Sequence, residues 1–317
     1  MNETVIQFGP ARSLVGIVTA PPQAERDPEC PAVVLLNAGL LHRVGPNRIY
    51  VQLARALAQD GFTVLRFDFS GLGDSRPRAD HLPYAQSAPL EAREAMDWLA
   101  QHHGAQRFLL IGHCAGAAFA LLVAREDPRV VGAALINLEG GDAQWTEFDR
   151  IKKVSQQNAR NYGQHAIFSR ERWAKLLSGR ADYGSITRVV LKDILWYRIV
   201  GFSFRASHVL AARRPAVQAE QAARAQQYLG PIIERGAALL LLHSEGSTGL
   251  EQIRAQLGGE LERLIAAGKL ELTVIAQSDH LFTLVARQRQ LCAVLQAWAQ
   301  AHFGARSSHL LSASSVE

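Results

Sequence analysis

Short apolar runs alternate along the chain with longer segments whose apolar residues recur at helical spacing. The runs are rich in valine, leucine and isoleucine, as expected for strands buried on both faces. They cover residues 31–37, 62–67, 108–111, 130–137, 237–243 and 270–276. The helical patterns cover residues 47–59, 89–103, 115–125, 249–266 and 284–302, and residues 3–20 have the pattern of a hairpin. This alternation predicts an α/β fold with a mainly parallel sheet and helices on both faces.

One long segment interrupts the alternation. Residues 142–233 contain polar and aromatic residues without a strand pattern, which predicts a helical cap inserted into the core. The core then consists of residues 1–141 and 234–306, and the serine-rich residues 307–317 are expected to form a flexible tail. A chain of 317 residues is long enough for one large α/β domain with such an insertion.

Composition excludes several classes of protein. An apolar fraction of 48% and a charged fraction of 20% are ordinary for a globular protein. Residues 1–20 lack the features of an export signal, and no apolar stretch is long enough for a membrane span. The 3 cysteines form no CxxC pair and are too few for a disulfide framework. We therefore expect a cytoplasmic protein without a cofactor or a cluster of metal ligands.

The basic residues are concentrated in the predicted cap, but they do not form a stripe dense enough for nucleic-acid binding. They fit either solvated helix faces or contacts with the phosphates of coenzyme A or an acyl carrier protein. The sequence leaves the oligomeric state open.

The strongest chemical signal is a cysteine between a predicted strand and a predicted helix, in the segment Gly112-His-Cys-Ala-Gly-Ala117. Glycines two positions before and after Cys114 relieve crowding in a sharp strand-to-helix turn. The N-terminus of the helix should lower the pKa of the Cys114 thiol and favour the thiolate. Cys114 is thus the candidate nucleophile, and the backbone N–H of Ala115 is a candidate oxyanion donor. The alternative is a buried, unreactive cysteine.

A histidine follows the last predicted strand. Since the carboxyl ends of parallel strands meet at one edge of a sheet, His280 is expected to reach Cys114 and act as its general base. A purely structural histidine is the alternative.

An acid is needed to orient the imidazole. We expect it after the strand at residues 237–243, where Glu245 is the candidate. Asp142 and Glu139, which follow the preceding strand, are the alternatives, and a solvated Glu245 without a role is also open.

The loop after the first core strand supplies the remaining candidates. Gly39 or Leu40 is expected to provide a second oxyanion N–H, because glycine permits an unusual backbone path there. The candidate substrate contacts are His42, Arg43, His113, Trp173 and Trp196. Each has a structural alternative: His42 and Arg43 could cap the following helix, His113 could be structural, and the tryptophans could form the interior of the cap.

With these residues in place, the chain resembles the α/β-hydrolase superfamily over most of its length. The segments 37–48, 65–75 and 112–117 are similar to those of exosortase-associated and serine-aminopeptidase-like hydrolases, some of which carry cysteine at the nucleophile position. Similar Cys-His-acid arrangements occur in dienelactone hydrolases, polyhydroxyalkanoate synthases and certain thioesterases. The resemblance implies acyl chemistry through a covalent intermediate, and the absence of an aspartate after the strand at 237–243 departs from it.

Two functions remain open from the sequence. The first is a thioesterase, esterase or acyltransferase, since a thioester acyl-enzyme reacts with amines, alcohols and thiols as well as with water. The second is a binding or scaffold protein that keeps the fold without turnover.

Overall fold

A computed structural model describes residues 1–22, 30–139, 215–245 and 247–304. Contacts divide the chain into two compact units, residues 1–148 with 223–317, and residues 149–222. Most of the predicted cap and the predicted tail lie outside the described residues.

The first unit is built on a single eight-stranded sheet in the order β1-β2-β4-β3-β5-β6-β7-β8. Its strands are β1 (Asn2–Phe8), β2 (Leu14–Ala20), β3 (Ala32–Leu36), β4 (Val64–Phe67), β5 (Phe108–His113), β6 (Val130–Ile136), β7 (Ala238–Ser244) and β8 (Glu271–Ile275). β1 and β2 form an antiparallel hairpin, β2 pairs antiparallel with β4, and the remaining pairs are parallel. The predicted hairpin and mainly parallel sheet are confirmed.

The described α-helices are α1 (Ile49–Gln59), α2 (Tyr84–His103), α3 (Ala115–Glu126), α7 (Pro215–Glu234), α8 (Gly249–Leu257), α9 (Gly259–Ala266) and α10 (Val285–Phe303). Short 3-10 helices cover Pro10–Arg12 and Pro46–Arg48. The helix predicted at 249–266 is in fact two helices, because Gly258 adopts φ 52° and ψ −137° and interrupts the helical backbone. None of the helices in the described part of the chain is long and apolar enough to cross a bilayer.

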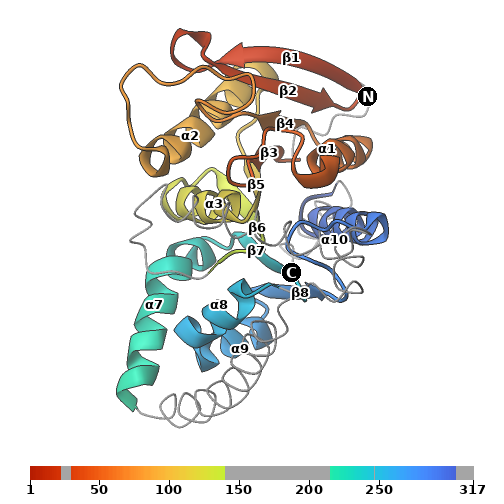
Figure 1. The fold of residues 1–317 in the computed structure, drawn as a ribbon. Coiled ribbons are helices and arrows are strands. Elements are labelled where there is room, and N and C mark those ends of the chain that lie inside the picture. The colour runs from red at the N-terminus through yellow and green to blue at the C-terminus, as the bar shows by residue number, and fades with distance from the viewer. Residues whose placement is uncertain (23–29, 140–214, 246, 305–317) are drawn as a thin grey trace, which may run out of the picture. The chain divides into compact units, whose positions relative to one another are not determined.

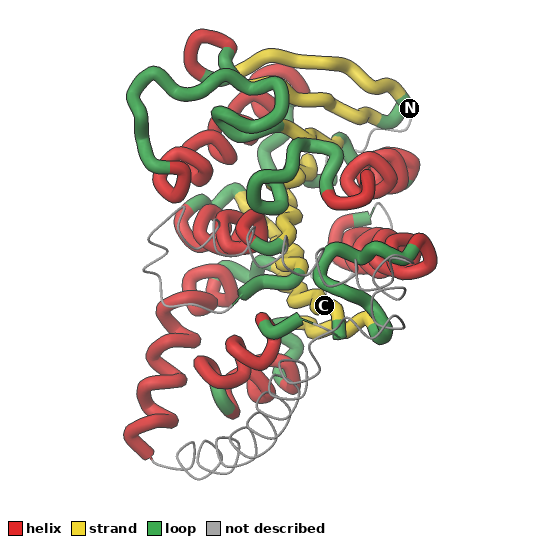
Figure 2. The backbone as a smooth tube through the Cα atoms, viewed as in Figure 1, coloured by secondary structure: helices red, strands yellow, loops and turns green. Residues whose placement is uncertain are grey.

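Alternate residues of each central strand enter two separate apolar clusters. Val34 and Leu36 of β3 pack in the larger cluster, with residues of α2, α3, α7, α8 and α9. Val33 and Leu35 pack in the second cluster, with α1 and α10. Figures 1 and 2 show the strands running between these helices. Both faces of the sheet are therefore covered, which is why the strands are apolar throughout.

Candidate active site

Cys114 occupies a strained turn between β5 and α3. Its backbone has φ 56° and ψ −114°, a conformation that residues with side chains rarely adopt. A Cβ on Gly112 would lie 2.1 Å from the carbonyl oxygen of Gly116, and a Cβ on Gly116 would lie 2.5 Å from those of Leu36 and Asn37. The predicted reason for both glycines is thus confirmed, and the elbow is packed directly against the end of β3.

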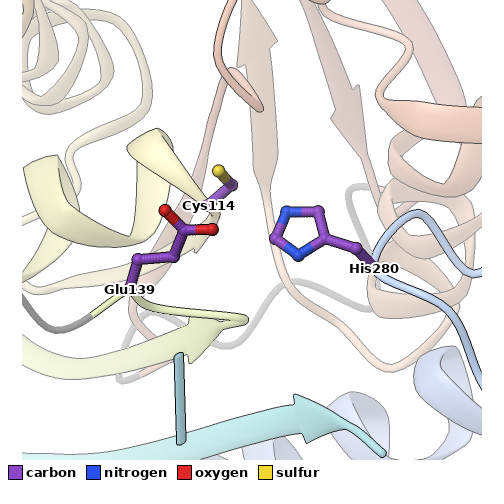
Figure 3. A group of neighbouring side chains, drawn as sticks. All are labelled: Cys114, Glu139 and His280. Atoms are coloured by element: carbon purple, nitrogen blue, oxygen red, sulfur yellow. The ribbon is translucent and has the colours of Figure 1, made fainter. Parts of the chain in front are cut away.

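Three side chains from distant parts of the sequence meet at the carboxyl edge of the sheet. The Cys114 sulfur, a carboxylate oxygen of Glu139 and a ring nitrogen of His280 all lie within 4.8 Å of one another. Figure 3 shows them converging from the turn after β5, from the end of β6 and from the loop after β8. A thiol, an imidazole and a carboxylate at this spacing have the composition of a nucleophile, a base and an orienting acid.

The structure does not bring Glu245 into this group. Glu245 is exposed, and its carboxylate accepts the backbone N–H of Gln277 at 2.6 Å, joining the turns that follow β7 and β8. Asp142 lies outside the described residues. The carboxylate that reaches Cys114 and His280 is that of Glu139, which the sequence offered only as an alternative.

The backbone at Leu138 and Glu139 lies in close contact with the first residue of α8. A Cβ on Gly249, the first residue of α8, would lie 2.2 Å from the carbonyl oxygen of Leu138 and 3.3 Å from the Cα of Glu139. Only glycine fits this approach without movement of the backbone. The segment after β7 therefore contributes packing, rather than a carboxylate, to the site.

Asn137 joins the segments that carry the site, a role that the sequence pattern did not reveal. It follows β6 with a positive φ of 47°, and its Nδ2 donates to the backbone carbonyl of His280 at 2.9 Å. The same Nδ2 lies 3.3 Å from Nε2 of His113. Its Oδ1 accepts the backbone N–H of Ser244 at 2.8 Å. The backbone of His280 is thereby tied to β5, β6 and β7.

His113 lies against His280 and is buried rather than at the exposed edge of the site. It is 2% exposed, and its ring centroid is 5.0 Å from that of His280. Burial, with the nearby His280, lowers the pKa of His113 to about 3, so the ring is neutral at physiological pH. The structure thus places His113 as a packing partner of His280 and does not expose it for the predicted substrate contact.

The candidate oxyanion loop follows β3 and lies against the elbow. Gly39 has φ 59°, and its carbonyl accepts a hydrogen bond from the half-buried Tyr84 hydroxyl at 3.2 Å. Leu41 N–H donates to the Ala38 carbonyl at 3.1 Å, which closes a turn around Gly39 and Leu40. The Ala115 N–H acts on the Cys114 sulfur and lowers the pKa of its thiol. The loop begins at Asn37, whose carbonyl lies against Gly116 in the first turn of α3, so it starts beside the elbow, where an oxyanion hole would be formed.

A buried carboxylate fixes the far end of this loop. Asp68 is fully buried, pairs with the guanidinium of Arg43 and accepts the Arg43 backbone N–H at 2.5 Å. Arg43 also pairs with Asp74 at 2.6 Å. These ion pairs occupy the Arg43 guanidinium, which was a candidate substrate contact, whereas His42 is exposed. The other two candidates, Trp173 and Trp196, lie outside the described residues.

The ionisation of the thiol differs from the prediction. Burial, together with the negative charge of the neighbouring Glu139 carboxylate, raises the pKa of the Cys114 thiol to about 12. The Ala115 N–H opposes this shift but is outweighed, because removing a thiolate from water costs more than one helix N-terminus returns. Burial also lowers the pKa of His280, although Glu139 acts in the opposite direction. The resting pair is therefore a neutral thiol beside a neutral imidazole.

Alkylation of Cys114 is expected to follow this raised pKa. In metal-free protein the rate of modification by iodoacetamide should still be rising at pH 10, because the thiolate is the reactive form. Glu139→Gln removes a negative charge beside the sulfur, so it should lower the pKa of the thiol and speed alkylation at any fixed pH in this range. Peptide mass spectrometry measures both rates. A rate that reached its plateau below pH 8 would contradict this ionisation state.

The sequence pattern predicts no cluster of metal-ligating residues, whereas the described part of the chain brings three such residues together. Cys114, Glu139 and His280 offer sulfur, oxygen and nitrogen ligand atoms in one place. The sequence could not show this group, because its members lie far apart along the chain.

Comparison with known proteins supports the fold. Residues 31–176 match the family described as alpha/beta hydrolase fold. Among solved structures, an esterase of Pyrococcus furiosus superposes with a TM-score of 0.57 and 13% identity, over 96% of this chain and 91% of that one. An alpha-beta serine hydrolase homologue from Coxiella burnetii gives a TM-score of 0.50 and 15% identity, over 93% and 96% of the two chains. The chain is therefore an α/β-hydrolase-fold protein, as its sequence indicated.

Curated relatives cover only part of the chain. An uncharacterized protein of Rickettsia prowazekii is 30% identical over 105 residues, which are 32% of this chain and 43% of the relative. A Klebsiella pneumoniae protein named RutD, to which carbamate hydrolysis is provisionally attributed, is 35% identical over 106 residues, or 33% of this chain and 37% of the relative. The matches thus span less than half the length of each relative. The narrower resemblance to exosortase-associated hydrolases stays a prediction.

Proposed function

We propose that the protein is an acyl hydrolase or acyltransferase in which Cys114 is the nucleophile, His280 the general base and Glu139 the orienting acid. The observation that carries the proposal is the convergence of these three groups at a strained elbow, with their reactive atoms within 4.8 Å of one another. Strain of this kind persists where the surrounding structure holds it, and it is concentrated at functional sites.

The resting ionisation defines the first step. Since the thiol is neutral, His280 must take its proton as the sulfur attacks the carbonyl carbon of the substrate. The carbonyl oxygen becomes an oxyanion, which the N–H groups of Ala115 and of Gly39 or Leu40 would stabilise. Glu139 stabilises the imidazolium that forms, consistent with its raising of the His280 pKa.

Collapse of this intermediate expels the alcohol or thiol leaving group, which receives the proton from His280. The product is a thioester between the acyl group and Cys114. In the second half of the reaction His280 takes a proton from water, and the resulting attack on the thioester releases the carboxylic acid and restores the thiol. An amine, alcohol or thiol in place of water would give acyl transfer.

The nucleophile favours particular substrates. A thiol attacks thioesters and activated esters readily, so acyl groups carried by coenzyme A or an acyl carrier protein are the substrates we propose first. The cap residues that would meet such a carrier lie outside the described part of the chain. Carbamates are a further class to test, because the relative named RutD is associated with them.

A binding or scaffold protein is the second function considered from the sequence. The lack of an aspartate after β7 is the sequence feature that favours this alternative. Glu139 now supplies a carboxylate beside the base, so this departure no longer favours the loss of turnover.

Intact-mass spectrometry tests the proposed function. Wild-type protein offered acyl thioesters of graded chain length, activated esters and carbamates should gain the mass of one acyl group, located on Cys114 by peptide mapping. Addition of amine or thiol acceptors should shorten the lifetime of the adduct if the enzyme transfers acyl groups. Cys114→Ala should gain no mass. Absence of any adduct on wild-type protein whose Cys114 is still alkylated by iodoacetamide would count against covalent acyl chemistry.

A further inference from the structure

Besides forming a candidate catalytic triad, the group of Cys114, Glu139 and His280 contains ligand atoms for a metal ion. They offer one thiol sulfur, one carboxylate oxygen and one imidazole nitrogen, and all three residues are partly exposed. Figure 3 shows the Glu139 carboxylate and the His280 ring directed toward each other beside Cys114. A cation entering from the edge of the sheet would meet all three donors together.

The spacing suits a small cation after modest movement. Bonds to zinc of about 2.3 Å from sulfur and about 2.0 to 2.2 Å from nitrogen or oxygen place tetrahedral ligand atoms about 3.5 Å apart. The observed atoms lie within 4.8 Å of one another, so contraction by about 1 Å completes the geometry. Rotation of the long Glu139 side chain would move its carboxylate closer to the other two ligand atoms without a change in the sheet.

The donor set selects among cations. Thiolate and imidazole are preferred by zinc and by late transition metals, whereas magnesium and calcium require oxygen ligands. A thiolate and a carboxylate together balance the two positive charges of zinc. Three protein ligands leave a fourth tetrahedral position for water, as in open zinc sites.

We propose that these three side chains form a reversible zinc site, and that zinc bound there blocks the acyl chemistry. Binding displaces the thiol proton to solvent and forms zinc bonds to sulfur, nitrogen and oxygen. The sulfur electron pair and the imidazole nitrogen are then no longer available for attack and proton transfer. The inhibitory effect rests on the proposed function, whereas the binding does not.

Cobalt(II) titration of the metal-free full-length protein tests binding without any substrate. Cobalt takes the place of zinc and absorbs in the near ultraviolet when a thiolate coordinates it. Wild-type protein should bind one equivalent with this absorption, and added zinc should abolish it. Cys114→Ser should lose the absorption, and His280→Ala and Glu139→Gln should each bind at least about 10-fold more weakly.

Matched variants and a second assay separate this proposal from the proposed function. Cys30→Ala and Glu245→Gln remove a thiol and a carboxylate outside the group, and both should bind cobalt as wild type does. If hydrolysis is observed, zinc should inhibit it and a chelator should restore it, while magnesium should have no effect. Lack of a Cys114-dependent absorption in a hydrolytically active protein would overturn the zinc site alone. Cobalt binding without acyl adducts would keep the zinc site and overturn the proposed function.

Discussion

Replacement of Cys114 by alanine is expected to lower kcat/KM for the preferred ester or thioester by about 10,000-fold. The substitution removes the atom that forms the acyl-enzyme, and no neighbouring side chain supplies an equivalent nucleophile among the described members of the group, Glu139 and His280. The remaining activity would come from the oxyanion donors and from substrate binding. Steady-state kinetics on the substrate identified by mass spectrometry measures the change.

The loss should not reflect unfolding. Cys114 is partly exposed, and alanine removes only the sulfur, so the free energy of unfolding should change by less than about 1 kcal/mol. Cys30 provides the control, because its thiol donates to the Phe303 carbonyl at 3.2 Å, remote from the elbow in the sequence. Cys30→Ala should keep wild-type kinetics. A Cys114→Ala enzyme with undiminished turnover would remove the thiol from the mechanism.

Glu139→Gln is expected to lower kcat/KM by about 100-fold to 10,000-fold, whereas Glu245→Gln should change it by less than about 3-fold. Glutamine keeps the size of the side chain but no longer stabilises the imidazolium that forms during attack. The Glu245 carboxylate instead accepts the backbone N–H of Gln277, so the substitution should destabilise that turn rather than lower kcat/KM. The pair of isosteric variants therefore distinguishes the two candidate acids.

The pH profile separates a catalytic carboxylate from a structural one. Glu139 raises the pKa of His280, so its neutralisation should lower that pKa and move the acidic limb of kcat/KM to lower pH. Glu245→Gln should leave the limb unchanged. If Glu245→Gln caused the larger loss and the shift in pH profile, the assignment of Glu139 as the acid would be wrong.

Much of the fold and part of the site could be predicted from the sequence because the relevant signals are local. Continuous apolar runs located the strands, and the spacing of Gly112 and Gly116 around Cys114 located the elbow. The glycines are required by contacts with the backbone immediately around them. His280 could be placed at the same edge of the sheet because all parallel strands end there.

The acid could not be chosen in the same way. The carboxyl ends of β6 and β7 are neighbours in the sheet, so the sequence pattern alone predicts a carboxylate near His280 equally well after either strand. The choice depends on details without a sequence pattern, namely the positive φ of Asn137 and the approach of Gly249 to the Leu138 carbonyl. The one available signal for Glu139 was its position directly after a buried strand.

The prediction that Cys114 is a thiolate was wrong for a related reason. A helix N-terminus is visible in the sequence pattern, but the extent to which the surrounding chain excludes water from Cys114 is not. Burial is the largest influence on the pKa of this thiol, and it depends on residues from several distant segments. The first turn of the helix lowers the pKa of the Cys114 thiol, as predicted, but burial raises this pKa by more.

The amide of Asn137 has a consequence for motion in the site. Its nitrogen donates a hydrogen bond to the backbone carbonyl of His280, and its oxygen accepts one from the backbone N–H of Ser244. If the His280 loop moved outward, the buried amide of Asn137 would lose its hydrogen-bond partner. The free-energy cost of such an unsatisfied group is about 1 to 3 kcal/mol. Substrate entry and product departure should consequently proceed past a stationary base, with any gating left to other parts of the chain.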